Sequence, residues 1–203
     1  MSAQHDTAVG GRVRTSRGLK TQARLLEAGR AVFMEKGYHA ARVDDVAAAA
    51  EISHGTFYLY FASKEALFER LVADVAAEMA ELAAEAPTSV VGDDGRARLR
   101  EWVDRMAQLY ERSGSVLATW TEAELSGQPI GHLGNDVIGG LAAVLATQSR
   151  LPKRTGLDPA IASLAVIAMT ERLLYHTATK QLRVRRSDLV DLICDVIVDG
   201  LLA

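Results

Sequence analysis

The stretch EISHGTFYLYFASKEALFER, residues 51–70, places four aromatic rings within five residues of a chain in which aromatic residues make up 5% of the total. On a helix, Phe57 and Phe61 share one face, because residues four apart lie one above the other. Tyr58 and Tyr60 lie on either side of that face. The two phenylalanines are therefore predicted to be core residues, and the two tyrosines need another role.

The sequence on either side of this stretch carries signals for helix starts and stops. Gly37 supplies a stop for a first helix predicted from Thr21, and Ser53 is placed to cap the aromatic helix. Residues 43–50 predict a short helix between these two, and Ser63 is placed to cap a long helix after them. Two short helices joined by a tight connection are typical of a helix-turn-helix. The tyrosine hydroxyls are then available as donors to DNA phosphates.

The runs RLLEAGRAVFMEKGY and VDDVAAAAEISHGTFYLYFASKEALF, within residues 22–68, resemble the DNA-binding half of the tetracycline-repressor-like, or TetR, family of bacterial transcriptional regulators. GTFYLYF together with SKEAL is the most specific part of the match. The resemblance implies an all-α homodimer with a DNA-binding head of three helices and a helical core that binds a small molecule and releases DNA. Carried over to this sequence, the DNA contacts of the family fall on Arg42, His54, Gly55, Thr56, Tyr58, Leu59, Tyr60 and Lys64.

Two positions depart from the family pattern. Glu51 stands at a turn position that is usually glycine, where a left-handed conformation costs about 1 kcal/mol. His54 stands where lysine is common, which weakens the electrostatic contact with DNA at neutral pH. Neither departure changes the predicted fold, but the second makes the base preference of the family harder to transfer.

The composition predicts an all-α protein, and the periodic segments suggest about nine helices. Alanine is abundant and only 4 of the 203 residues are proline, which favours helices over strands. Cys194 is the only cysteine, so neither a disulfide nor a cysteine-based metal site is expected. The N-terminus has no apolar secretory segment, and no uncharged run reaches the roughly 18 residues of a membrane span. A cytoplasmic protein with no membrane partner is expected.

Charge is distributed unevenly along the chain. The first 64 residues hold 9 Lys/Arg and 6 Asp/Glu, whereas the remainder holds 14 and 20, which suggests different partners for the two parts. Residues 1–18 are predicted to be a flexible basic arm that contacts phosphates or the minor groove, with a plain solvated tail as the alternative. Residues 19–66 are assigned to the DNA-binding head, and residues 67–203 to an effector-binding and dimerisation domain.

The second domain shows helical periodicity without a transferable motif. It has no GxSxG, no phosphate-binding glycine loop and no HExxH, so neither an enzymatic activity nor a cofactor or metal is expected. Large apolar side chains with polar tips recur at helical spacing from Trp102, and they either fill a core or line a pocket for an organic ligand. The candidate effector contacts are Trp102, Met106, Tyr110, Trp120, His132 and Tyr175.

The last two helices predict a dimer interface. Aspartates recur at three- and four-residue steps from Asp188 to Asp199 and form one solvated acidic stripe, while nearly all other residues there are apolar. The helix that starts at Pro159 carries a similar apolar excess. Such surface is rarely left in water, so both helices are predicted to pair with their symmetry mates, unless a larger internal core buries them. The named interface residues are Val166, Met169, Ile193 and Ile197.

A ligand-responsive transcriptional regulator fits these features best. We expect a repressor that leaves a pseudo-palindromic DNA operator when a small, mostly apolar effector binds. The alternative is a dimeric DNA-binding protein with no small-molecule ligand, whose second domain serves only dimerisation. An accessible cavity would favour the first hypothesis, and a filled core the second.

Overall fold

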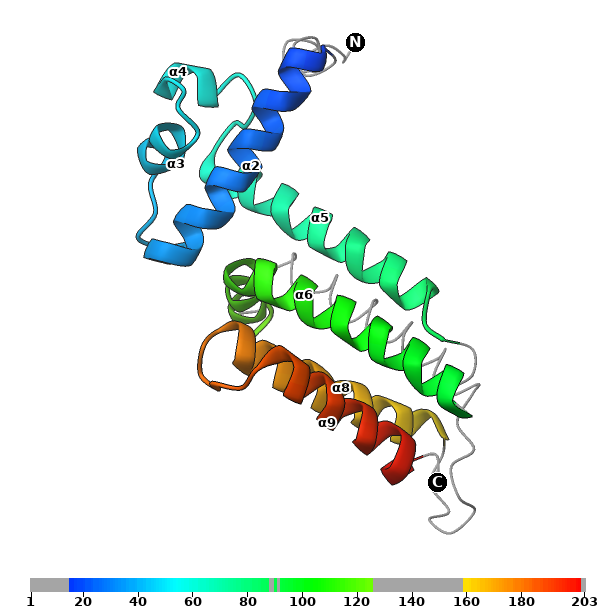
Figure 1. Ribbon diagram of the computed structural model, residues 1–203. Helices are drawn as coiled ribbons and strands as arrows, with labels where there is room; N and C mark the ends of the chain where they lie inside the picture. Colours follow the sequence, from blue (N-terminus) through cyan, green and yellow to red (C-terminus); the bar gives the residue numbers. More distant parts are fainter. Residues whose placement is uncertain (1–14, 88–89, 91, 126–158, 202–203) are drawn as a thin grey trace, which may run out of the picture. The chain divides into compact units, whose positions relative to one another are not determined.

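The computed structural model of the chain describes residues 15–87, 90, 92–125 and 159–201. These residues form seven α-helices and a terminal π-helical turn, with no β-strand among them (Figure 1). The all-α prediction is confirmed. The chain divides into two compact units, Met1–Ala73 and Asp74–Ala203. The described part of the first unit is called the head below.

The head begins with α2, Ser16–Lys36. The side chain of Thr15 accepts a hydrogen bond from the backbone N–H of Gly18 at 3.1 Å, which satisfies one of the free N–H groups of the first turn. The helix therefore starts five residues before the predicted Thr21. The last residues of the predicted arm, 1–18, are thus helical, while its first 14 residues lie outside the described part of the chain.

Helices α3, Val43–Ala49, and α4, His54–Phe57, form the predicted helix-turn-helix. The turn between them passes through Glu51, whose φ of 53° lies in the left-handed region expected at this position. The backbone N–H of Ile52 closes the turn by donating to the Ala47 carbonyl at 3.0 Å. The turn geometry that the family pattern assigns to glycine is therefore adopted here by a residue with a full side chain.

We expect Glu51→Gly to stabilise the head, because glycine avoids the Cβ strain of about 1 kcal/mol at positive φ. The substitution also removes an ion pair in which Arg24 Nη2 lies 3.3 Å from the Glu51 carboxylate, but both side chains are exposed and such pairs contribute little. Glu51→Ala is the matched control, since it removes the same ion pair and keeps the Cβ. In urea unfolding, the free energy of unfolding of Glu51→Gly should exceed that of Glu51→Ala by up to about 1 kcal/mol. Equal stabilities would mean that the turn carries no strain.

Helix α5, Lys64–Ala84, begins in the head and continues into the second unit. The Ser63 hydroxyl accepts a hydrogen bond from the Ala66 N–H at 3.2 Å, which confirms the predicted cap. Gly29 of α2 lies against α5, since a Cβ at that position would be 2.8 Å from Leu67 Cδ2. Leu67 is fully buried, so the absence of a side chain at Gly29 is what lets the two helices pack closely.

The second unit contains α6, Gly92–Leu125, a single helix of 34 residues. The apolar pattern of the sequence predicts two helices here, one over residues 99–110 and a second that carries Trp120, and this prediction is wrong. Gly114, which interrupts the apolar pattern, lies inside the helix at a close contact: a Cβ there would be 3.1 Å from the Ala178 carbonyl oxygen. The glycine therefore serves helix packing and does not end the helix. The run VIGGLAAVLATQSRL, residues 137–151, also has the apolar pattern of a helix, and this predicted helix lies outside the described residues.

Helices α8, Pro159–Ala178, and α9, Arg186–Asp195, follow, and the π-helical turn Val196–Leu201 continues α9. The predicted helix start at Pro159 is confirmed. The aspartates of α9 were expected to form a solvated stripe, and the side chains of Asp191 and Asp195 are exposed, but both also pair with arginines of α6. Arg100 Nε lies 2.7 Å from Asp191 Oδ1, and Arg96 pairs with Asp195. The acidic stripe thus connects two helices of the same chain.

Within the described ranges, no helix is both long enough and apolar enough to cross a membrane.

Candidate nucleic-acid interface

The aromatic cluster of residues 57–61 divides into an inner and an outer pair. Phe57 is completely buried and Phe61 nearly so, as the helical spacing predicts. Tyr58 is 45% exposed and Tyr60 is half-buried. Two side chains thus anchor this segment to the head, while the two tyrosines reach its surface.

Local hydrogen bonds fix the start of α4. The Ser53 hydroxyl accepts from the Thr56 N–H at 3.1 Å, so the predicted cap is confirmed. The hydroxyls of Ser53 and Thr56 also lie 2.8 Å apart, within hydrogen-bond distance. Beyond the single turn of α4, the Tyr60 N–H donates to the Phe57 carbonyl at 2.9 Å, which extends the ordered backbone to the tyrosines. The segment presents its outer side chains on a hydrogen-bonded backbone.

Several of the residues predicted to contact DNA lie outside the core of the head. His54, Gly55, Tyr58 and Leu59 are all exposed. A Cβ on Gly55 would meet no atom within 4 Å, and its φ is not positive, so the fold itself does not require glycine there. Leu59 leaves 41% of its surface exposed, although burial of an apolar side chain would be favourable. The packing of the head therefore explains neither the glycine at 55 nor the exposed leucine at 59.

Arg42 is exposed at the N-cap of α3. Its backbone N–H donates to Asp45 Oδ2 at 2.9 Å, and Lys36 Nζ donates to Asp45 Oδ1 at 2.6 Å. These two hydrogen bonds, the one from Lys36 foremost, lower the pKa of the Asp45 carboxyl. The backbone around Arg42 is thus fixed while its side chain is exposed, which fits the predicted phosphate contact.

Lys64 was also predicted to contact phosphate, and the structure gives its ammonium partners within the head. Its Nζ donates to the carbonyls of Tyr38 at 2.8 Å and Ala41 at 3.1 Å. It also lies 4.4 Å from the centre of the Tyr38 ring, a cation–π contact. Burial, followed by the charge of Glu65, raises the pKa of Tyr38 to about 12. Lys64 therefore braces the start of α5 against the connection between α2 and α3.

Nothing in the sequence singles out Asp44, which lies in the first turn of α3 and is exposed. Its Oδ1 pairs with His54 Nδ1. The His54 ring also lies 5.1 Å from the Tyr58 ring, centre to centre, at an angle of 59°. Because DNA is negatively charged, a carboxylate is not expected at a surface proposed to bind it. The contact between Asp44 and His54 is found only in the structure.

Residues 25–71 match the model of the bacterial regulatory proteins of the tetR family. The head belongs to the TetR family. The HTH-type transcriptional regulator YdgC of Bacillus subtilis (strain 168) is 41% identical over 59 residues, which cover 29% of this chain and 30% of YdgC. The HTH-type transcriptional repressor DhaR of Mycobacterium sp. (strain GP1) is 52% identical over 42 residues, 21% of either chain. The chain thus matches less than a third of the length of these relatives.

Solved structures extend the likeness to most of the chain. The TetR family transcriptional regulator PfmR from Thermus thermophilus matches with a TM-score of 0.65 and 24% identity, over 88% of this chain and 98% of PfmR. The transcriptional regulator FadR from Bacillus subtilis, in complex with stearoyl-CoA, matches with a TM-score of 0.63 and 19% identity, over 88% of this chain and 98% of FadR. At these identities the likeness establishes a TetR-like fold.

In the second unit of this TetR-like fold, most of the predicted effector contacts are buried. Trp102, Met106, Tyr110 and Trp120 are each at most 9% exposed, and Tyr175 is half-buried. His132 lies outside the described residues. Burial raises the pKa of Tyr110 far above its ordinary value. These side chains pack in the interior, which suits a filled core as well as a closed pocket.

Two buried polar groups of this unit have no hydrogen-bond partner among the described residues: the indole N–H of Trp120 and the hydroxyl of Thr170. By contrast, the indole N–H of Trp102 donates to the Leu82 carbonyl at 2.7 Å. A buried polar group without a partner is costly, on the order of 1–3 kcal/mol, and usually signals a partner that is absent. Among the described residues, these two groups therefore differ from the indole of Trp102, whose hydrogen bond is made within the unit.

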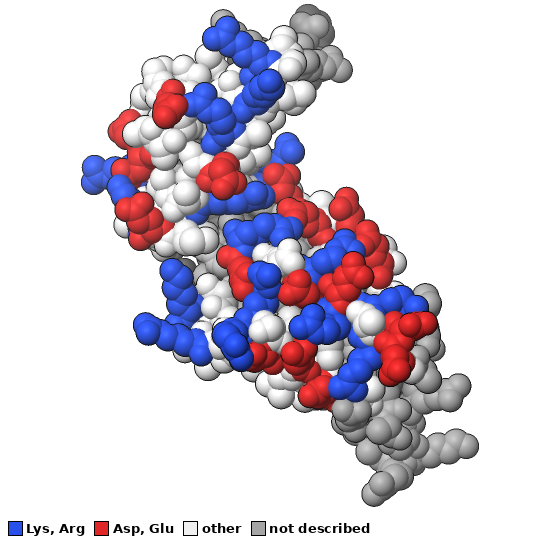
Figure 2. Space-filling view, in the orientation of Figure 1, with Lys and Arg blue, Asp and Glu red and all other residues white. Residues whose placement is uncertain are grey.

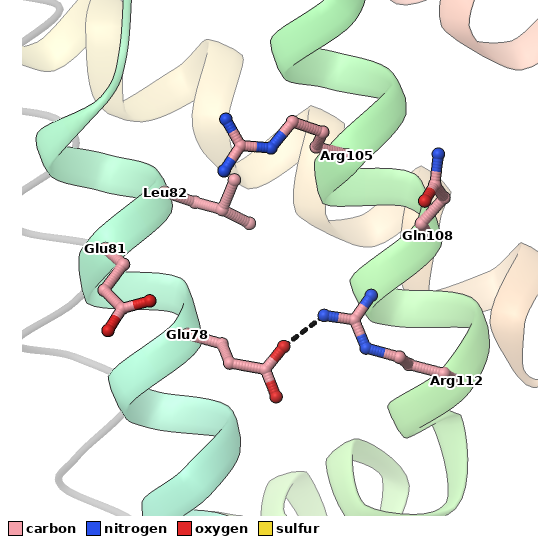
Figure 3. Close-up of a pocket in the computed structure, with 6 residues that line it drawn as sticks. All are labelled: Glu78, Glu81, Leu82, Arg105, Gln108 and Arg112. Carbon is pink, nitrogen blue, oxygen red and sulfur yellow. Dashed lines mark hydrogen bonds and ion pairs between the residues drawn. The ribbon is translucent and has the colours of Figure 1, made fainter.

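A groove of about 220 Å³ lies between α5 and α6, but its lining differs from the predicted effector contacts. Figure 3 shows side chains from both helices around it, including the ion pair between Glu78 and Arg112. Most of the side chains around it are charged or polar, so it does not suit a mostly apolar ligand. The lining residues are Glu78, Glu81, Leu82, Arg105, Gln108 and Arg112.

The predicted dimer contacts lie mostly inside the chain. Val166, Ile193 and Ile197 are buried and Met169 is half-buried. A side chain that is already covered by its own chain offers little surface to a partner. Other positions of α8 are exposed at helical spacing and form an outer apolar stripe, which consists of Ile161, Leu164, Ala165 and Ala168.

Proposed function

We propose that this TetR-family protein is a homodimeric transcriptional repressor that binds a pseudo-palindromic DNA operator and is released by a small, mostly apolar effector. The observation that carries the DNA-binding part is the exposed surface around α4, where Gly55 and Leu59 have no role in the fold. Tyr58 and Tyr60 supply hydroxyl donors for phosphates, and Leu59 is suited to contact a thymine methyl group. Such a protein works in the cytoplasm and needs no chemical step, cofactor or membrane.

The basic side chains of the head supply the phosphate attraction in this proposal. Arg17, Lys20 and Arg24 are exposed along α2, and Arg42 is exposed at the start of α3. Figure 2 shows basic side chains along α2, whereas acidic and basic side chains alternate over the second unit. Each phosphate contact steepens the salt dependence of binding. Lys64, Thr56 and His54 complete the proposed contact surface, with Lys64 acting in part as a brace.

Selection of bound duplexes from a random pool, followed by footprinting, tests this function. We expect an inverted repeat whose half-sites are about one helical turn apart, with one dimer per repeat. We also expect the affinity to fall steeply as salt rises. A protein that enriches no sequence over the starting pool would refute the proposed regulator, whatever its affinity for bulk DNA.

The effector part of the proposal is supported by the unpartnered N–H of Trp120 and hydroxyl of Thr170, which a ligand with polar atoms would satisfy. The burial of Trp102, Met106 and Tyr110 favours the alternative, a DNA-binding dimer without a ligand, because a filled core leaves no space for one. Stearoyl-CoA, which the FadR structure contains, is a first compound to test, together with smaller amphiphilic compounds.

Trp120 is a reporter that can separate these two hypotheses. The chain has 2 tryptophans, so Trp102→Phe leaves Trp120 as the only one. We expect an effector to shift the Trp120 emission and to dissociate DNA over the same concentration range. Trp120→Phe should lower the affinity for the effector about tenfold, because the buried hydrogen bond from the Trp120 N–H to the effector is lost. DNA binding that no compound in the panel alters, with constant Trp120 emission, would favour the ligand-free alternative.

A further inference from the structure

We propose that Asp44 holds His54 in the tautomer that carries its proton on Nδ1, so that Nε2 accepts a hydrogen bond from an exocyclic amino group in the major groove of the operator. The inference rests on the proposed DNA-binding function and deepens it. Asp44 is then a positioning residue, and His54 is the residue that reads the base. The amino group belongs to adenine (N6) or cytosine (N4), which share this donor chemistry.

The first step is the geometry of the pair. Asp44 comes from the first turn of α3 and His54 is the first residue of α4, so the contact joins the two helices of the helix-turn-helix. The ring of Tyr58 packs beside the imidazole on the same segment. The Asp44 contact at Nδ1 and the Tyr58 contact with the ring together restrict rotation of the His54 side chain. The imidazole is therefore oriented before DNA arrives.

The second step is the direction of the hydrogen bond. An ionised carboxylate only accepts hydrogen bonds, so Nδ1 must be the donor. A neutral imidazole carries one N–H, and its other nitrogen is then an acceptor. With Nδ1 engaged by Asp44, Nε2 is left as this acceptor on an exposed side chain. Asp44 thus decides which hydrogen-bonding character His54 presents outward.

The third step is what such an acceptor can distinguish. In the major groove, the amino groups of adenine and cytosine are donors, whereas guanine O6 and N7, adenine N7 and thymine O4 are acceptors. A lysine at this position would favour guanine, as would a histidine with its proton on Nε2. The Asp44 contact therefore inverts the expected preference at the base pair that His54 meets. This also accounts for a carboxylate close to a surface that binds a polyanion.

A purely structural role for Asp44 is the competing explanation, since an acid in the first turn of a helix stabilises it. Asp45 provides a matched control, because it lies in the same turn but is bonded to Lys36 and to the Arg42 N–H and not to His54. The Asp44–His54 pair is exposed, so its removal should leave the head folded. Asp44→Ala and Asp45→Ala therefore remove the same charge from neighbouring positions, and only the first frees His54.

The experiment combines two measurements on the full chain. Nitrogen-15 NMR at pH 8 reports the tautomer of neutral histidines, and His54→Gln identifies the His54 signal among the 5 histidines. Binding to the selected operator, with all four base pairs tried at each half-site position, reports the base preference. We expect wild-type His54 to carry its proton on Nδ1. We also expect a preference for adenine or cytosine at one half-site position, and the base-pair trials identify that base and position. Asp44→Ala should move the proton to Nε2 and reduce that preference about tenfold, while Asp45→Ala keeps both.

Two results would overturn the inference. One is a nitrogen-15 NMR spectrum of the wild-type protein that places the proton of His54 on Nε2. The other is an unchanged base preference in Asp44→Ala at a position where His54→Ala loses it. A wild-type protein that selects no duplex would overturn the proposed function as well, so the two failures are distinguishable.

Discussion

Gly55→Glu is expected to reduce operator affinity at least a hundredfold, which corresponds to about 2.7 kcal/mol, without lowering the melting temperature. The side chain would start in open space, because a Cβ on Gly55 meets no atom within 4 Å. On the proposed complex, the same space is occupied by the DNA backbone, so a carboxylate there meets both a steric barrier and phosphate repulsion. Fluorescence anisotropy with the selected operator measures the affinity, and thermal unfolding measures the stability.

Two further variants separate the sources of this effect. Gly55→Ala adds only a methyl group and should cause a smaller loss of affinity, with equal or greater stability since alanine is the better helix former. Ala31→Glu places the same charge at an exposed position of α2, away from α4 in the sequence, and should have a much smaller effect. If Gly55→Glu binds the operator as tightly as the wild type, α4 does not face DNA and the proposed interface must lie elsewhere.

The features of the head that the sequence predicts correctly depend on short-range geometry. Ser53 and Ser63 cap helices by bonds to N–H groups three residues on, and the burial of Phe57 and Phe61 follows from a spacing of one helical turn. The positive φ at Glu51 follows from the tightness of a turn that glycine usually occupies. In each case the deciding atoms lie within a few residues of one another, so a local pattern contains the information.

The features that the sequence does not predict depend on residues far apart in the chain. Lys64 bonds to the carbonyl of Tyr38, 26 residues away, and the pair between Arg100 and Asp191 spans 91 residues. No local pattern distinguishes such a charged side chain from a solvated one. Gly114 presents the same difficulty, since its close packing partner, Ala178, lies on another helix far along the chain.

The burial of α8 and α9 leads to the second prediction of large effect. The residues first named for the dimer interface, among them Val166 and Ile197, are covered within the chain, so glutamate at either position is expected to unfold the second unit. The outer stripe of α8 remains available to a partner, and Ile161 and Leu164 each leave about half of their surface exposed. We therefore propose that the dimer forms through this stripe, together with exposed Leu192 of α9.

Leu164→Glu is accordingly expected to give a folded monomer whose operator affinity is at least a hundredfold lower, because one head can occupy only one half-site at a time. Sedimentation equilibrium gives the association state, and far-UV circular dichroism shows whether the helices persist. Met34→Glu is the matched control, since Met34 is equally exposed but lies on α2 of the head, and this variant should remain a dimer. The two α8 substitutions should thus have different outcomes: glutamate at position 164 should give a folded monomer, and glutamate at position 166 should unfold the second unit. If Leu164→Glu stays a dimer with wild-type affinity, the subunits associate through another surface and the exposed stripe of α8 needs a different partner.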